Sequence, residues 1–122
     1  MKMEPAAAAP GPMVQGFGPG GFRIDGVPHR SALLTVLEAT DWSPPTLSEL
    51  TVEALQPLVA ARPEFILLGT GVRLVRPPAA LTRALEAAGV GLEPMDSRAA
   101  ARAWGVLRSE GRQIAAALYP LD

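Results

Sequence analysis

The chain has 122 residues, 48% hydrophobic and 19% charged, so it can bury one core and is too apolar for a disordered protein. Eleven basic and twelve acidic residues nearly cancel, which excludes the net field that draws proteins to nucleic acid or anionic membranes. Without cysteine and with His29 as the single histidine, the chain lacks the usual ligands of zinc and copper. No apolar run reaches the roughly 20 residues that span a bilayer. The composition therefore predicts a cytoplasmic protein without metal or cofactor.

Residues 1–13 are predicted to form a flexible tail. Pro5, Pro10 and Pro12 interrupt its short alanine run and leave no continuous apolar region for a signal peptide. Residues 14–122 are predicted to be a single domain, because no internal repeat or boundary marks a second one.

The first part of the domain has the pattern of a β-hairpin. The glycine-rich stretch at 16–21 (GFGPGG) predicts a turn, and a short strand follows at 22–24. Asp25-Gly26 then favours a tight hairpin turn. The return strand is expected at 29–37, and since both of its faces are mostly apolar, it should lie inside a sheet.

The rest of the chain alternates between strand and helix patterns. A helix capped by Thr51 is expected to be short or kinked, or to start later, because Pro57 lacks a backbone donor and crowds the preceding turn. Strands are predicted at 64–68, 72–75, 90–94 and 113–119, and amphipathic helices at 81–88 and from Asp96 or Ser97 to Gly111. This alternation predicts the α/β class, with a mixed sheet covered by helices and its alternating part parallel.

Two glycine motifs invite a nucleotide-binding interpretation, and neither fits it. Gly16, Gly18 and Gly21 match G-x-G-x-x-G, but a strand follows them where a helix should open, and Lys2 is the only lysine available. The stretch 69–71 follows a buried strand but lacks the third glycine of the fingerprint. Both motifs are predicted to serve turns or close packing.

No catalytic constellation is recognisable. His29 and Ser31 lie two residues apart on a predicted strand and could form a base and nucleophile pair. No nucleophile elbow or oxyanion hole accompanies them, so a structural or surface role is favoured for both.

The start of the last helix carries an unusual cluster of charge. Arg98 and Arg102 oppose the helix dipole and repel each other, so Asp96 and Glu93, or else an acidic ligand or partner, should compensate them. The ends of the parallel strands should meet at this edge, where α/β proteins place their crevices. The predicted functional surface consists of Gly69, Thr70, Gly71, Arg76, Asp96, Ser97, Arg98 and Arg102.

Several short motifs occur together from Val14 to the end of the chain: GFRI at 21–24, LLGTG at 67–71, RP at 76–77, MDS at 95–97 and EGR at 110–112. In this combination the chain resembles the domain-of-unknown-function family that includes the mitochondrial respiratory complex I assembly factor three and many bacterial and archaeal proteins. The resemblance implies a three-layer α/β fold. For the eukaryotic relatives it implies a role in assembling a membrane-bound respiratory enzyme, without catalysis.

These observations predict a non-enzymatic accessory protein, similar to an assembly factor, that acts by contact with a protein partner. The alternative is a domain that binds a small molecule or anion, or an uncharacterised enzyme, and uses the cleft at the strand ends. A docking protein should expose a large apolar or mixed patch, whereas a ligand site should be concave with converging polar groups.

Overall fold

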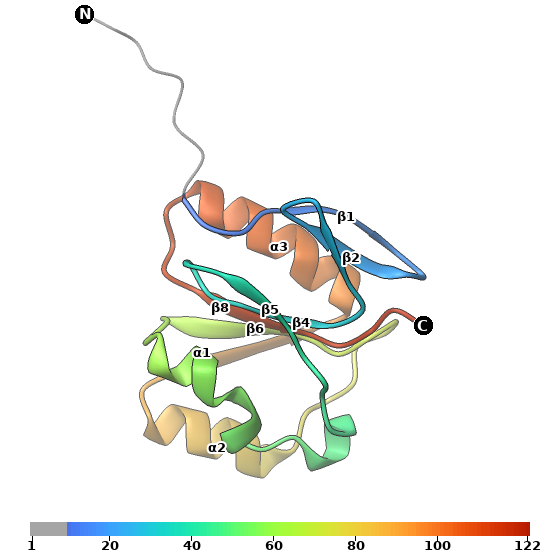
Figure 1. Ribbon diagram of the computed structural model, residues 1–122. Coiled ribbons are helices and arrows are strands. Elements are labelled where there is room, and N and C mark those ends of the chain that lie inside the picture. The colour runs from blue at the N-terminus through green and yellow to red at the C-terminus, as the bar shows by residue number, and fades with distance from the viewer. Residues whose placement is uncertain (1–9) are drawn as a thin grey trace, which may run out of the picture.

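The computed structural model describes residues 10–122, which form three layers (Figure 1). A five-stranded mixed sheet lies in the middle. Helix α3 (Ser97–Ser109) and a three-stranded antiparallel sheet lie on one side of it, and helices α1 (Gln56–Ala60) and α2 (Ala79–Ala87) lie on the other. The α/β class and the layered arrangement expected from the sequence are confirmed.

The strands form two sheets: the first three strands of the chain make the small sheet, and the remaining five make the central sheet. The small sheet has the order β1-β2-β3, and the central sheet has the order β5-β4-β8-β6-β7. The strands are β1 Val14–Gly18, β2 Gly21–Ile24, β3 Val27–His29, β4 Ala32–Leu34, β5 Ala39–Asp41, β6 Phe65–Gly69, β7 Gly91–Met95 and β8 Ala115–Leu118; two 3-10 turns occupy Leu47–Glu49 and Glu53–Leu55.

Strand β8 is the centre of the molecule, and all four of its residues are buried. It runs parallel to β6 and antiparallel to β4. Its alternating side chains enter two separate cores: Ala116 and Leu118 pack with Trp104 of α3, whereas Ala115 and Ala117 pack with the side of α1 and α2. Because three of its four side chains are single methyl groups, both outer layers can approach the sheet closely.

Most helix boundaries follow the local chemistry expected of them. Pro57 lies in the first turn of α1, where its missing N–H costs nothing, so the helix starts later than Thr51. Helix α2 ends before Gly89, whose φ of 81° is the left-handed conformation of a helix end. Asp96 is the N-cap of α3, since its Oδ1 accepts a hydrogen bond from the Ala99 amide at 2.9 Å.

Three predicted elements differ from the structure. Residues 72–75 form an exposed loop, because β6 is already paired on both edges and offers no place for another strand. The stretch at 16–21 is only partly a turn: its first glycines belong to β1, which pairs with β2. The return strand after Asp25-Gly26 divides at Arg30, so that β3 stays in the small sheet and β4 enters the central one.

The beginning of the described chain is tied to α3. The indole Nε1 of Trp104 donates to the carbonyl of Pro12 at 2.9 Å, and Nη2 of Arg108 donates to the carbonyl of Pro10 at 2.9 Å. Residues 10–13 of the predicted tail therefore contact the domain, and residues 1–9 lie outside the described part.

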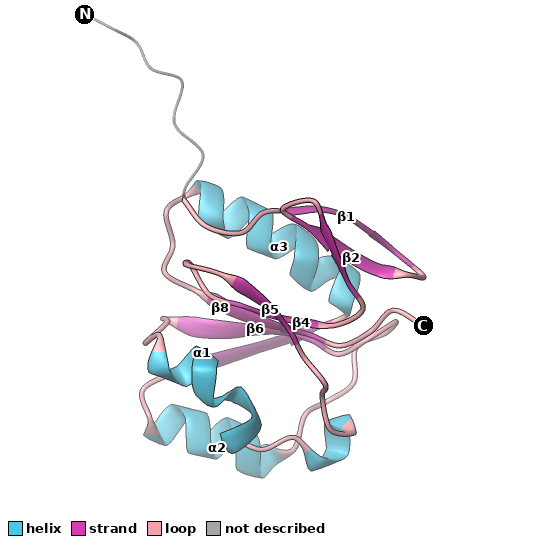
Figure 2. Cartoon of the chain, viewed as in Figure 1, coloured by secondary structure: helices cyan, strands magenta, loops and turns pink. Residues whose placement is uncertain are grey.

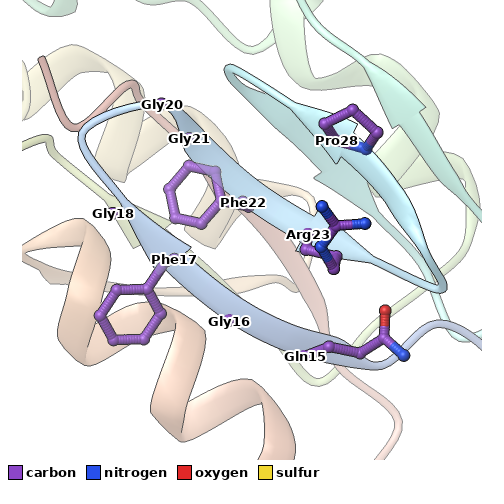
Figure 3. A pocket seen from close by; sticks show the side chains of 9 residues that line it. All are labelled: Gln15, Gly16, Phe17, Gly18, Gly20, Gly21, Phe22, Arg23 and Pro28. Carbon is purple, nitrogen blue, oxygen red and sulfur yellow. The ribbon is translucent and has the colours of Figure 1, made fainter.

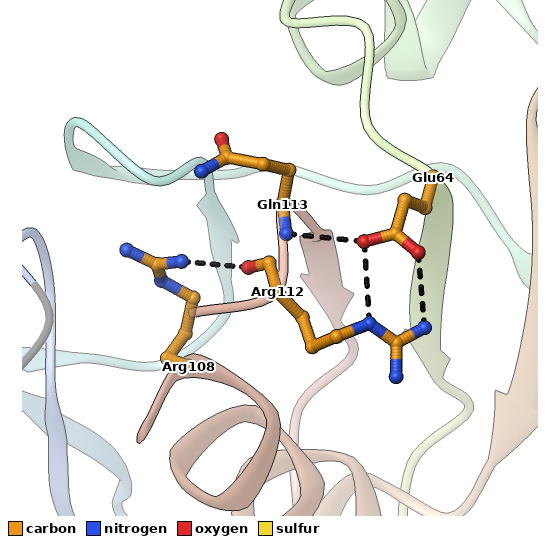
Figure 4. A network of polar contacts seen from close by, with 4 residues as sticks. All are labelled: Glu64, Arg108, Arg112 and Gln113. Atoms are coloured by element: carbon orange, nitrogen blue, oxygen red, sulfur yellow. Dashed lines mark hydrogen bonds and ion pairs between the residues drawn. The ribbon is translucent and has the colours of Figure 1, made fainter. Parts of the chain in front are cut away.

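Polar contacts also join the starts of β6 and β8 (Figure 4). The carboxylate of Glu64 accepts two bonds from the Arg112 guanidinium, at 3.0 and 3.2 Å, and one from the Gln113 amide at 3.3 Å. The hydrogen bond to Arg112 lowers the pKa of Glu64 and raises the pKa of Arg112. The pair is exposed, so it aligns the strand starts more than it stabilises them.

The Trp104 contact provides a test of how firmly the chain start is held. We expect Trp104→Phe to lower the free energy of unfolding by about 1–3 kcal/mol, because the buried Pro12 carbonyl loses its donor. Urea denaturation measures the change. Val106→Ala, at an exposed position of the same helix, should stay within about 0.5 kcal/mol of wild type. Equal stability of Trp104→Phe and wild type would contradict this role.

Candidate functional site

The carboxyl ends of β6, β7 and β8 meet where α3 begins. The Thr70 amide donates to the Met95 carbonyl at 2.8 Å, and the Tyr119 amide donates to the Gly69 carbonyl at 2.9 Å. The Ser97 amide donates to the Gly71 carbonyl at 2.8 Å. The structure thus brings together the glycine turn and the helix start, two segments that lie far apart in the sequence.

Ser97 is the centre of this junction and is completely buried. Its Oγ accepts a hydrogen bond from the Gly71 amide and donates one to the Tyr119 carbonyl, both at 2.8 Å. Gly69 lies against it so closely that an added Cβ would lie 2.9 Å from the Ser97 Cα. The hydroxyl therefore joins three elements of the fold and has no free group to offer a ligand.

Thr70 and Asp96 are also occupied by the fold itself. The Thr70 hydroxyl accepts a hydrogen bond from the Val75 amide at 3.0 Å and lies 2.8 Å from the Arg73 carbonyl, to which it can donate. Asp96 caps α3 through Ala99. These polar groups are directed into the backbone around them.

The three arginines of the predicted functional surface lie in different parts of the structure. Arg76 is exposed on the loop after β6, and Arg98 is half-buried in the first turn of α3. Arg102 lies toward the small sheet, where its guanidinium carbon is 5.2 Å from the centre of the Phe17 ring. Among the described residues, neither Asp96 nor Glu93 forms the ion pair with these arginines that the sequence suggested.

Beside the junction lies a surface that the sequence interpretation missed. Val72, Leu74 and Val75 are 57%, 60% and 44% exposed, and they alternate with the exposed Arg73 and Arg76. We call residues 72–76 the apolar-basic loop. The signal for this surface in the sequence is VRLVRPP at 72–78, where apolar residues stand between arginines. Such a pattern fits the predicted strand, and it equally fits an exposed docking loop.

Two hollows border the C-terminal segment next to this loop. One, of about 310 Å³, is lined by the loop, and the other, of about 950 Å³, is lined by Trp42 and the prolines that follow it. Figure 2 shows the chain after β6 beside the C-terminal segment at the same end of the sheet. The two hollows share Arg30, Tyr119, Pro120 and Asp122.

An ion pair lies between these hollows. The guanidinium of Arg30 donates two bonds to the carboxylate of Asp122, from Nε to Oδ2 and from Nη2 to Oδ1, both at 3.0 Å. The hydrogen bond from Arg30 lowers the pKa of Asp122, and the same bond raises the pKa of Arg30.

A third hollow, of about 460 Å³, lies on the small sheet (Figure 3). Gly16, Gly18 and Gly20 line it, and an added Cβ at any of the three would meet no atom within 4 Å. Phe17 points away from the Arg23 side, toward α3. The chain continues from the glycines into β2, so no helix start faces them as a phosphate-binding motif requires.

His29 and Ser31 do not form a catalytic pair. His29 Nδ1 lies 2.6 Å from Oδ1 of Asp41, which links β3 to β5. The Ser31 hydroxyl donates to the Trp42 carbonyl and not to the histidine. The first contact joins the small sheet to the central one, and the second extends the pairing of β4 with β5.

Within residues 10–122, no group of three histidine, aspartate or glutamate side chains is arranged to hold a metal ion. No helix in this part of the chain has the length and apolar character needed to cross a membrane.

The layers, the strand order and the closed junction define an α/β domain that carries an open surface at its strand ends. The chain belongs to the family of proteins of unknown function DUF498/DUF598, whose profile matches residues 14–119. It is 42% identical over 118 residues to an uncharacterised protein of Rhodobacter capsulatus, and the alignment covers 97% of this chain and 91% of that protein. It is 31% identical over 116 residues to the NADH dehydrogenase [ubiquinone] 1 alpha subcomplex assembly factor 3 of Danio rerio, over 93% of this chain and 67% of that protein.

Solved structures show the same fold. A crystal structure from Bordetella parapertussis superposes with a TM-score of 0.84 at 32% identity, over 93% of this chain and 98% of that one. A solution structure from Bordetella pertussis, described as a Mth938-like domain, gives 0.78 at 27% identity, over 98% and 91%. A crystal structure described as an outer membrane protein of Bartonella henselae gives 0.82 at 27% identity, over 93% and 98%.

The junction is tested by Ser97→Ala. We expect the free energy of unfolding to fall by about 1–3 kcal/mol, because the Gly71 amide and the Tyr119 carbonyl lose a buried partner. Chemical denaturation measures it, and Ser109→Ala, at an exposed serine of the same helix, should change it by less than about 0.5 kcal/mol. If both variants behave alike, the hydroxyl of Ser97 has no structural role.

Tyr119 provides a pH-dependent probe of the same region. Burial raises its pKa to about 12, and its hydroxyl donates to the Pro45 carbonyl at 2.8 Å. In the unfolded chain the group ionises near pH 10. Its contribution to stability is therefore complete below about pH 10 and is lost as the pH rises toward about 12.

Because Tyr119 is the only tyrosine, the ultraviolet absorbance of tyrosinate reports this group alone. We expect a midpoint at about pH 12 for the folded protein, and one near pH 10 in denaturant. A native midpoint near 10 would show that the ring is solvated.

Proposed function

We propose that the protein is a non-enzymatic accessory protein, of the assembly-factor kind, that acts by binding another protein through the apolar-basic loop. The observation that supports this most directly is the exposure of Val72, Leu74 and Val75 beside a junction whose polar groups are already hydrogen-bonded internally. Exposed apolar side chains that adjoin one another on a small domain are typical of docking surfaces.

The loop is held in one shape before any partner arrives. The Thr70 hydroxyl bonds to the Val75 amide and to the Arg73 carbonyl, and thereby closes the loop over itself. Pro77, which follows Arg76, is buried and fixes the exit of the loop. A preorganised surface loses less conformational entropy on binding, so a small contact area can suffice.

The small-ligand alternative has weaker support from the same region. A site for a small molecule or anion needs convergent free donors in an enclosed cavity. Here the Ser97 hydroxyl, the Thr70 hydroxyl and the Asp96 carboxylate are bonded to the backbone. Thr70 does line the smaller hollow, but its hydroxyl is already bonded to the backbone of the loop, and neither Ser97 nor Asp96 lines either hollow.

The relative from Danio rerio is named as an assembly factor of an NADH dehydrogenase subcomplex, and the alignment covers 93% of this chain. That name supports an assembly role for the present protein as well. An assembly factor must hold a partner and later release it, and a contact made by a few aliphatic side chains and two arginines suits such reversible binding.

Affinity capture with matched variants tests this function. We expect the double variant Val72→Ser, Leu74→Ser to recover about tenfold less of its partner from extracts of its own source than wild type, because central apolar anchors contribute most of a binding energy. Val106→Ser is the control, since Val106 is 58% exposed on α3, away from the loop. Quantitative mass spectrometry measures the yields.

Both variants should unfold within about 0.5 kcal/mol of wild type, because the replaced side chains are on the surface. If the double variant recovers the same proteins at the same yield as Val106→Ser, the apolar-basic loop is not the contact surface.

A further inference from the structure

We propose that Arg30 is a carboxylate-binding position on this surface, and that the partner segment is an extended, acidic and apolar peptide whose carboxylate replaces that of Asp122. This inference rests on the proposed function and specifies the chemistry of the partner. It is carried by the place of the Arg30–Asp122 pair between the two hollows.

The geometry of the pair is that of a bound acidic ligand. The guanidinium meets the carboxylate with two nearly parallel bonds of 3.0 Å, from Nε and from Nη2. Arginine recognises carboxylates in this bidentate way, and lysine cannot reproduce it. Asp122 therefore occupies the position that the carboxylate of a partner would take.

The aspartate can leave without disturbing the fold. The side chains of Arg30 and Asp122 are 70% and 43% exposed, and solvated ion pairs contribute little to stability. The preceding residue, Leu121, is buried in the core beside α3 and anchors the backbone. Only the side chain of Asp122 has to move for Arg30 to become available.

The surroundings of Arg30 select an acidic and apolar segment. In the smaller hollow Arg30 and Arg73 supply positive charge, Asp122 is the lining carboxylate, and Val72 and Val75 form apolar walls. Neither Arg73 nor Arg76 forms an ion pair with any described residue. Once Asp122 is displaced, Arg30 and Arg73 have no carboxylate opposite them in the lining of the smaller hollow.

The place of the two hollows favours an extended peptide. The two hollows adjoin at Arg30, Tyr119, Pro120 and Asp122, so an extended segment placed along the C-terminal segment would border both of them. Asp41, which also lines the larger hollow, is held by His29 and discourages a second acidic residue there.

The experiment is an NMR titration of the isotopically labelled protein with two peptides, acetyl-Leu-Glu-Leu-Glu-Leu-amide and its glutamine counterpart. We expect saturable shifts of the Arg30 side-chain N–H and of the Val72 and Val75 amides with the glutamate peptide. The glutamine peptide should bind about tenfold more weakly, because it lacks the charge-assisted pair.

Two substitutions separate this inference from simple charge attraction. Asp122→Asn removes the competing carboxylate and should tighten binding of the glutamate peptide about threefold or more, whereas Arg30→Gln should weaken it about tenfold. Arg62→Gln, which removes an exposed arginine outside both hollows, is the charge-matched control and should leave binding unchanged.

Equal affinity for both peptides, or no effect of Asp122→Asn and Arg30→Gln, would overturn the inference. So would binding of the apolar-basic loop to phosphatidylserine vesicles in place of the peptide, or a dimer that shifts the same resonances on concentration. The two proposals can fail separately. If the loop variant loses its partner in affinity capture, but Arg30→Gln captures normally and neither peptide binds, the proposed function stands and only the acidic-peptide inference fails.

Discussion

The fold depends on the contact between Ser97 and Gly69. Helix α3 begins directly against the end of β6, and this is possible only because Gly69 has no Cβ that would meet the Ser97 backbone. The Ser97 hydroxyl then satisfies the Gly71 amide and the Tyr119 carbonyl, which the ends of two parallel strands would otherwise leave unpaired in the interior. One small side chain thereby connects β6, β8 and α3.

This contact also explains what the most recognisable motifs of the chain do within the fold. The glycine turn at 69–71 and the segment at 95–97 attract notice because α/β proteins place ligands at strand ends. Here the same residues close that edge: their hydroxyl and amide groups bond to one another, and Asp96 caps the helix. The available surface is consequently shifted outward, to the loop that leaves β6 and to the C-terminal segment beside it.

Much of the fold could be predicted because local chemistry and tertiary structure agree. The apolar spacing at 81–88, the cap at Asp96 and the turn at Asp25-Gly26 each produced the expected element. The errors arose where pairing decided the outcome. Residues 72–75 have a strand pattern but follow β6, which is already paired on both sides, and the glycines of β1 extend because β2 pairs with them.

The candidate site was less predictable because its determinants are not local in sequence. Side-chain type limited the cap to Asp96 or Ser97, and Asp96 is the cap in the structure. Nothing in the sequence shows that Ser97 faces inward or that Arg102 turns toward Phe17. Arg30 and Asp122 are 92 positions apart. They meet only because the chain passes from the small sheet into β4, which lies beside β8. A carboxylate held by an exposed arginine at such a crossing costs the fold little to release. For that reason the polar groups at the strand ends can all be hydrogen-bonded within the fold while the Arg30 guanidinium can still be offered to a partner.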